Sequence, residues 1–166
     1  MNQTIELLTS HRSIRKFTDE PVDHALLARL VDAAQAAASS SFLQGVTIIR
    51  VTDPTKRSAF KDITGGQVYV EAAPEFLVFC ADLSRPMRCC NAHGGTPVEG
   101  LTEHFIIATV DAALYAQNVA VAAESAGLGI CYIGAIRNDI ARSAELLDLP
   151  QQVYPVFGMC IGWPDQ

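Results

Sequence analysis

The stretch FIIATVDAALYAQNVAVAA, residues 105–123, decides which kind of fold this chain can adopt. It carries a single charged residue, Asp111, and its length is about that of a membrane-spanning helix. Asp111, Gln117 and Asn118 lie inside it, however, and a carboxylate in lipid is energetically expensive. The stretch therefore favours a helix over residues 102–126 at the centre of a soluble core. We expect this helix to be buried all round, in part against a copy of itself in a dimer.

Apolar segments on both sides of this helix predict four β-strands. They are rich in β-branched and aromatic residues and occupy residues 46–51, 75–82, 129–136 and 154–163. Capping and turn residues predict shorter helices over residues 4–8, 23–37, 54–64 and 138–149. Residues 83–101 contain several glycines and prolines and are expected to form an irregular loop. This order of elements is typical of an α/β or α+β sandwich.

Composition narrows the classes of protein that fit. The chain has 166 residues, enough for one domain, and is 49% hydrophobic but only 18% charged, which a buried subunit interface would explain. Its net charge of -6 argues against a nucleic-acid binder. The first ten residues show no secretory pattern, and five cysteines are an odd number, so we expect reduced thiols and a cytoplasmic location.

The segment HRSIRKF, residues 11–17, concentrates positive charge near the start of an acidic chain. Arginine binds phosphate through its planar fork, and Ser13 adds a hydroxyl donor. If the preceding helix continued, Arg12 and Arg15 would share one face. The same residues also fit solvated cations at a helix C-terminus. Spacing alone leaves both interpretations open.

Other motifs point to a flat polar ligand, although each also fits an ordinary turn. TGGQVY, residues 64–69, offers an amide and a phenol behind a glycine turn. The glycines of GLGICYIGAIRN, residues 127–138, let backbone N–H groups approach a ring closely. These glycines precede a strand rather than a helix, which excludes a Rossmann dinucleotide site. The cysteines and histidines of residues 89–104 match no common zinc spacing.

Taken in order, five segments resemble the nitroreductase superfamily. They are TIELLTSHRSIRKFTDEPV, SSSFLQ, TGGQVYVEAAPEFLVFCAD, AAESAGLGICYIGAIRN and LPQQVYPVFGMCIGWP, and together they span nearly the whole chain. The similarity is greatest to the oxygen-insensitive NADPH nitroreductases and the NADPH–flavin oxidoreductases. It implies an α+β fold with a mixed sheet flanked by helices, in one FMN-binding domain over residues 1–166 that dimerises through a long buried central helix.

The resemblance also implies an activity. Members of this family are homodimers that pass hydride from NADPH through FMN to nitroaromatics, quinones or free flavin by a ping-pong mechanism. The flavin carries the chemistry, so no catalytic side chain and no metal are expected. A non-catalytic flavin-binding or flavin-carrying protein is the alternative. Neither nucleic acid nor a membrane is an expected partner.

The same resemblance assigns cofactor-binding roles to ten residues. His11, Arg12 and Ser13 would hold the FMN phosphate and ribityl chain, and Arg15 would face the pyrimidine side of the ring. Ser39 would contact the FMN of the other subunit. The remaining residues, which would line the flavin, are Gln67, Tyr69, Tyr132, Ile133 and Gly134.

Two features depart from the family pattern. Relatives continue beyond the position of Gln166, with a Lys-x-Arg pair for the phosphate and a basic residue for NADPH, so the chain looks truncated at its C-terminus. Ala135 stands where similar proteins have a second glycine.

Overall fold

Strand β2 (Glu75–Asp82) lies inside the sheet, and all eight of its residues are buried. The computed structural model describes residues 2–166 and contains β1 (Val46–Arg50), β3 (Gly129–Ile133) and β4 (Val153–Gly162) as well. The strand order is β1-β2-β4-β3. The three pairings in the described residues are antiparallel, so the expected mixture of parallel and antiparallel strands is not seen there, while the α+β class is confirmed.

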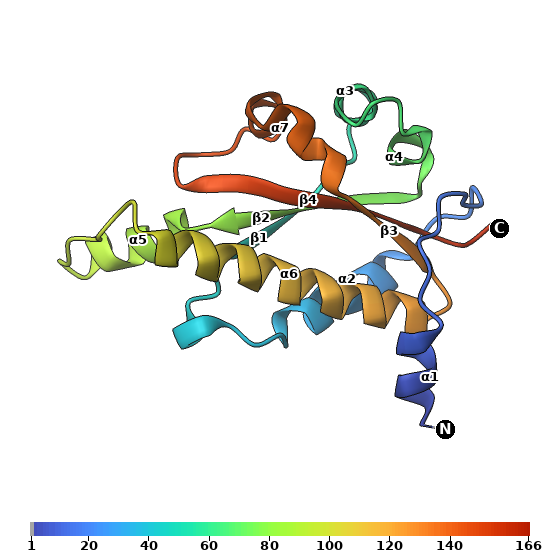
Figure 1. The fold of residues 1–166 in the computed structure, drawn as a ribbon, viewed down its shortest axis with the longest axis horizontal. Coiled ribbons are helices and arrows are strands. Elements are labelled where there is room, and N and C mark those ends of the chain that lie inside the picture. Colours follow the sequence, from blue (N-terminus) through green and yellow to red (C-terminus); the bar gives the residue numbers. More distant parts are fainter. Residues whose placement is uncertain (1) are drawn as a thin grey trace.

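Helices cover both faces of this sheet (Figure 1). One face carries α2 (His24–Gln35) and α6 (Thr102–Ser125), and the other carries α3 (Pro54–Ile63), α4 (Val68–Ala72) and α7 (Ile140–Leu146). Helices α1 (Gln3–Thr9) and α5 (Ser84–Ala92) lie at opposite ends of the molecule. Two 3₁₀ segments, η1 (Ser40–Phe42) and η2 (Gly134–Asp139), complete the fold.

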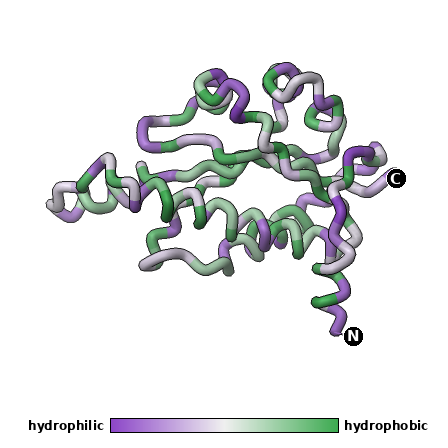
Figure 2. The backbone as a smooth tube through the Cα atoms, viewed as in Figure 1, coloured by the Kyte–Doolittle hydropathy of each residue, from purple (hydrophilic) through white to green (hydrophobic). Residues whose placement is uncertain are grey.

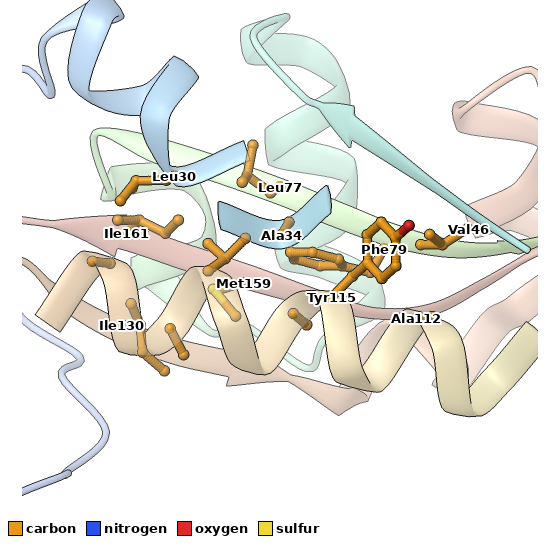
Figure 3. Packing of buried hydrophobic residues seen from close by; sticks show 14 of the residues in the cluster. Leu30, Ala34, Val46, Leu77, Phe79, Ala112, Tyr115, Ile130, Met159 and Ile161 are labelled. Carbon is orange, nitrogen blue, oxygen red and sulfur yellow. The ribbon is translucent and has the colours of Figure 1, made fainter. Parts of the chain in front are cut away.

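The alternation of side chains along each strand creates two apolar cores. Leu77 and Phe79 of β2 face α2 and α6, where they pack with Leu30, Tyr115 and other residues (Figure 3). The intervening β2 residues face α3 and α4 in a second cluster that includes Phe60. Because β2 contributes to both cores, its sequence is apolar throughout rather than alternating.

Helix α6 is the longest helix, and one of its faces is apolar but exposed. Ala112, Ala116 and Ala120 are fully buried against the sheet, whereas Phe105, Ile106, Val110 and Leu114 are 41–57% exposed. The sequence predicted a helix that is buried all round, in part against a second copy. Within one protomer, α6 is buried on one side only. By length and composition alone α6 could cross a membrane. In Figure 2, α6 runs alongside the sheet and is mostly white to green, the colours of the less polar residues.

Most predicted boundaries agree with the structure, and the differences have local causes. Asp23 and Asp53 cap α2 and α3 as expected. The first helix is capped by Asn2. The expected loop 83–101 instead begins with α5, which tolerates Pro86 because proline lies in its first turn, where N–H groups have no intrahelical partner. The third strand ends at Ile133, and η2 replaces its last residues and the start of the last predicted helix.

Candidate flavin-type binding site

The cationic segment 11–17 is extended, not helical, and lies against the edge strand β3. The Ile14 N–H donates to the carbonyl of Ile130 at 2.8 Å, which buries Ile14 and leaves Arg12 and Arg15 exposed. The chain end joins the same region, since Phe17 forms an isolated antiparallel bridge with Pro164. The helical spacing considered for Arg12 and Arg15 therefore does not apply.

Glycine at position 129 permits this close approach. A Cβ atom there would lie 2.5 Å from Cγ1 of Ile14, well inside van der Waals contact. The sequence pattern favoured Gly129 as room for a ligand. In the structure this position makes room for the chain's own N-terminal segment. That packing fixes where the preceding cations lie.

His11 and Arg12 border a small cavity of about 170 Å³ at the C-terminal end of α6. The Nδ1 atom of His11 lies 2.5 Å from the Glu124 carboxylate. Within residues 2–166, the Arg12 guanidinium makes one hydrogen-bond contact, to the backbone oxygen of Gln166 at 3.5 Å, which is long for a hydrogen bond. Most of the hydrogen-bonding capacity of Arg12 therefore remains for a ligand in this cavity.

Tertiary structure brings Arg15 to Tyr69, although they are 54 positions apart in the chain. Burial raises the pKa of Tyr69, and a hydrogen bond from Arg15 partly offsets that rise. Burial likewise raises the pKa of the Cys131 thiol on β3, against the charge of Arg15. Arg15, Tyr69 and Cys131 therefore form one electrostatic cluster beside β3.

Gln67 lies next to this cluster in the chain, at the N-terminus of α4. It follows Gly65 and Gly66, whose φ angles of 75° and 85° make the tight turn that glycine allows. Its Oε1 atom is buried and has no hydrogen-bond partner in the described part of the chain. A buried amide oxygen left unpaired costs free energy, so this atom marks a place where a ligand donor would be stabilising.

Tyr132 and Ile133 at the end of β3, and Gly134 at the start of η2, have different surroundings. The half-buried ring of Tyr132 packs edge-on against Phe157, its hydroxyl donates to Gln117 at 3.3 Å, and burial raises its pKa to about 12. The Ile133 side chain is 1% exposed in the opposite core, so only its backbone can meet a ligand. A Cβ on Gly134 would lie 3.2 Å from the Arg137 guanidinium.

Ser39 lies apart from the cavity beside His11. Its hydroxyl donates to Asp111 at 2.7 Å, in the first half of α6. Thirteen residues separate Asp111 from Glu124, the partner of His11, which corresponds to roughly 20 Å along a helix. Ser39 and the His11 cavity are therefore not parts of one pocket within a protomer.

Some charged or thiol-bearing partners of the predicted site residues were not themselves predicted. Glu124, Cys131 and Arg137 carry no local signal, because their roles arise from contacts across the fold. Asp111 did carry one, as the lone charge in an apolar helix, but the sequence did not say what it would bind. No group of three or more potential metal ligands is clustered in residues 2–166.

Comparison with known proteins identifies the class to which this fold belongs. The nitroreductase family matches residues 8–163, and the chain belongs to that family. It is 51% identical over 164 residues to the oxygen-insensitive NADPH nitroreductase of Salmonella typhimurium, covering 99% of this chain and 67% of that protein. It is 47% identical over 166 residues to the FMN reductase (NADPH) of Bacillus subtilis, with coverages of 99% and 67%.

Solved structures agree with the sequence comparison. The NADPH:FMN oxidoreductase of Vibrio harveyi complexed with NAD+ superposes with a TM-score of 0.94 at 47% identity, covering 99% of this chain and 70% of that one. Nitroreductase A of Vibrio parahaemolyticus gives a TM-score of 0.95 at 48% identity, with coverages of 100% and 69%. The chain thus spans about two thirds of the length of the relatives it matches.

Proposed function

We propose that this protein is an FMN-dependent oxidoreductase that takes hydride from NADPH and reduces nitroaromatics, quinones or free flavin by a ping-pong mechanism. Residues 1–166 form its single FMN-binding domain, which works as a homodimer in the cytoplasm. The observation that carries the proposal is that Arg15 interacts with Tyr69, two residues after Gln67, whose buried amide oxygen has no partner among the described residues. The redox reaction is inferred from the relatives, which are named as an NADPH nitroreductase, an FMN reductase (NADPH) and an NADPH:FMN oxidoreductase.

The phosphate end of FMN fits the cavity beside Arg12. A dianionic phosphate needs several donors. His11 and Arg12 line the cavity, and Ser13 follows them in the chain. The His11–Glu124 contact holds the imidazole in place. Arg12 supplies a guanidinium that the protein itself barely uses.

The ring end fits the cluster beside β3. The Gln67 amide oxygen would accept from a ring N–H, which removes the cost of leaving it unpaired. Arg15 and Tyr69 would donate to ring oxygens, while Tyr132, the Ile133 backbone and Gly134 would border the ring. The residues present therefore fit FMN.

Bound FMN supplies the hydride chemistry, and the protein supplies position and charge. A cation at Arg15 would stabilise negative charge on the ring of the bound cofactor. No acid–base pair of the protein is required.

The exposed apolar face of α6 supports a homodimer. Phe105, Ile106, Val110 and Leu114 would be covered by a second copy, which removes a contiguous apolar surface from water. Ser39 would then reach the FMN of the other subunit.

Absorption spectroscopy of the purified protein tests the proposal. FMN-loaded protein should be yellow, and the visible band should bleach when NADPH is added without oxygen. The colour should return when a quinone or a nitroaromatic is added. Protein that binds no FMN contradicts the proposal, and protein that binds FMN but is not reduced by NADPH supports the non-catalytic alternative.

A further inference from the structure

A cavity of about 310 Å³ lies at the end of the molecule that carries α5, away from the His11 segment (Figure 1). It is bounded by α5, by residues 96–98, by Leu43 and by His104 in the first turn of α6. His104 and Glu124 are 20 positions apart, which corresponds to roughly 30 Å along a helix. Within one protomer this cavity, the α5 cavity, is therefore separate from the one beside His11.

The walls of the α5 cavity are mostly apolar and carry no Asp, Glu, Lys or Arg among the described residues. They include two sulfur-bearing side chains three positions apart on one face of α5 and several aliphatic ones, namely Met87, Cys90, Leu83, Pro86, Pro97 and Val98. An ion would lose its hydration there without gaining a partner of opposite charge, so the cavity suits an uncharged ligand. Thioether sulfur makes favourable contacts with aromatic rings, which favours a ligand that contains one.

His104 supplies the polar feature of this wall. Its Nδ1 atom is buried and has no hydrogen-bond partner within residues 2–166. Leaving that atom unpaired costs free energy, which a ligand with a hydrogen-bonding group would recover. A hydroxyl group can donate to Nδ1 in one tautomer of the neutral imidazole and accept from it in the other. The ligand that matches both features is therefore an aromatic ring with a hydroxyl group.

We propose that the α5 cavity is a binding site for an uncharged aromatic alcohol, such as a phenol or a naphthol, whose hydroxyl group pairs with Nδ1 of His104. The volume of the cavity is at the lower end of the range for small-molecule sites. Val98 is 63% exposed, so a ligand seated against it would also remove apolar surface from water. One protomer builds this site without FMN, so the inference goes beyond the proposed function.

Two ligands that differ only in the hydroxyl group test the pairing. Equilibrium dialysis of the purified protein measures its affinity for 2-naphthol and for naphthalene. The variant His104→Phe keeps a flat ring but has no nitrogen. Relative to wild type, it should lose about tenfold in affinity for 2-naphthol, while its affinity for naphthalene stays the same. Wild-type protein that does not bind 2-naphthol, or an unchanged ratio of the two affinities in His104→Phe, would overturn the proposal.

Alkylation of two neighbouring cysteines locates the bound ligand. Cys90 lines the cavity and is partly exposed, whereas Cys89 is exposed and does not line it. Saturating 2-naphthol should slow the reaction of Cys90 with iodoacetamide, followed by mass spectrometry, and should leave Cys89 unaffected. His104 also borders a second cavity of about 390 Å³, together with Tyr154. Binding that leaves the alkylation of Cys90 unchanged would place the ligand outside the α5 cavity and overturn the assignment.

A surface variant provides a second test if His104→Phe does not fold. Val98→Asp puts a carboxylate on the exposed wall and should weaken the binding of 2-naphthol at least tenfold. Ile140→Asp is the matched control, because Ile140 is also exposed but lies on α7 and does not line the cavity. Equal affinities of these two variants would contradict the proposal. None of the measurements involves FMN or NADPH, so this site and the proposed function can fail independently.

Discussion

Arg50 of β1 binds the buried carboxylate of Glu75 through two parallel hydrogen bonds, Nε to Oε2 at 2.7 Å and Nη2 to Oε1 at 2.6 Å. The Glu75 side chain is 5% exposed, and its hydrogen bond raises the pKa of Arg50. Both carboxylate oxygens are occupied, so this pair joins two strands and is not a reactive site. The cost of burying Glu75 is offset only while Arg50 is present.

Arg50→Ala should therefore lower the free energy of unfolding by about 2–3 kcal/mol, since it leaves a carboxylate buried without its cation. We expect this loss to be smaller than that for a fully buried ion pair, because the Arg50 side chain is 35% exposed. Urea denaturation measures the change. The double variant Arg50→Ala/Glu75→Gln should recover part of the loss, and an unchanged loss would show that the pair is not coupled.

Asp82 predicts a pH dependence of stability. Burial alone would raise its pKa, but hydrogen bonds from Thr47, Ser84 and the backbone of Arg85 outweigh burial and leave the pKa lowered. Its stabilising contribution is therefore complete above the unfolded-state pKa of about 3.9 and is lost as the pH falls through the lower folded-state pKa. The melting temperature of wild type should exceed that of Asp82→Asn at pH 7, and the gap should shrink below about pH 4. A gap that stays constant with pH would contradict this assignment.

Arg12→Ala should weaken FMN binding by roughly 10- to 100-fold, the effect of losing one hydrogen bond to a charged group. Fluorescence titration of the apoprotein with FMN measures the dissociation constant. Arg88→Ala is the control, since Arg88 is exposed on α5 at the far end of the molecule (Figure 1). Equal affinities for the two variants would remove Arg12 from the site.

Arg15→Ala should lower the reduction potential of bound flavin, because the cation that favours the reduced ring is lost. Redox titration against a reference dye measures the shift. Arg15→Lys keeps the charge and should restore most of the potential, although it loses the planar fork. A potential that does not move in Arg15→Ala would place this side chain away from the ring.

Gln67→Leu should change stability and binding in opposite directions. The apoprotein should melt at a higher temperature, because a buried unpaired amide oxygen is removed. FMN affinity should fall, because the ring loses its acceptor. Calorimetry of the apoprotein and FMN titration check both effects. Weaker binding together with a lower melting temperature would indicate a structural role for Gln67 instead.

Local sequence determined the elements of the fold. Asp23 and Asp53 specify helix starts through side-chain caps, and the apolar runs around residues 75–82 and 154–163 specify buried strands. These signals act within a few residues, so a single sequence displays them. Helix α5 was not predicted, because its N-cap residue Leu83 provides no side-chain cap and the prolines and glycines of residues 83–101 favour a loop.

The motifs also named candidate site residues before their geometry was known. Arg15 and Tyr69 do meet, but their contact requires an N-terminal segment, α4 and β3 to be assembled. The sequence left open whether the first helix continues through the cations that follow it, and in the structure the Ile14–Ile130 hydrogen bond holds them on a non-helical segment beside β3.

Only the tertiary structure decided which groups act together. The pairing of His11 with Glu124 and of Ser39 with Asp111 joins positions 113 and 72 residues apart. No local propensity encodes such pairs, because they form only when the two cores have brought distant elements into contact. The exposure of one apolar face of α6 was decided in the same way, since hydrophobic periodicity shows which residues avoid water but not what covers them.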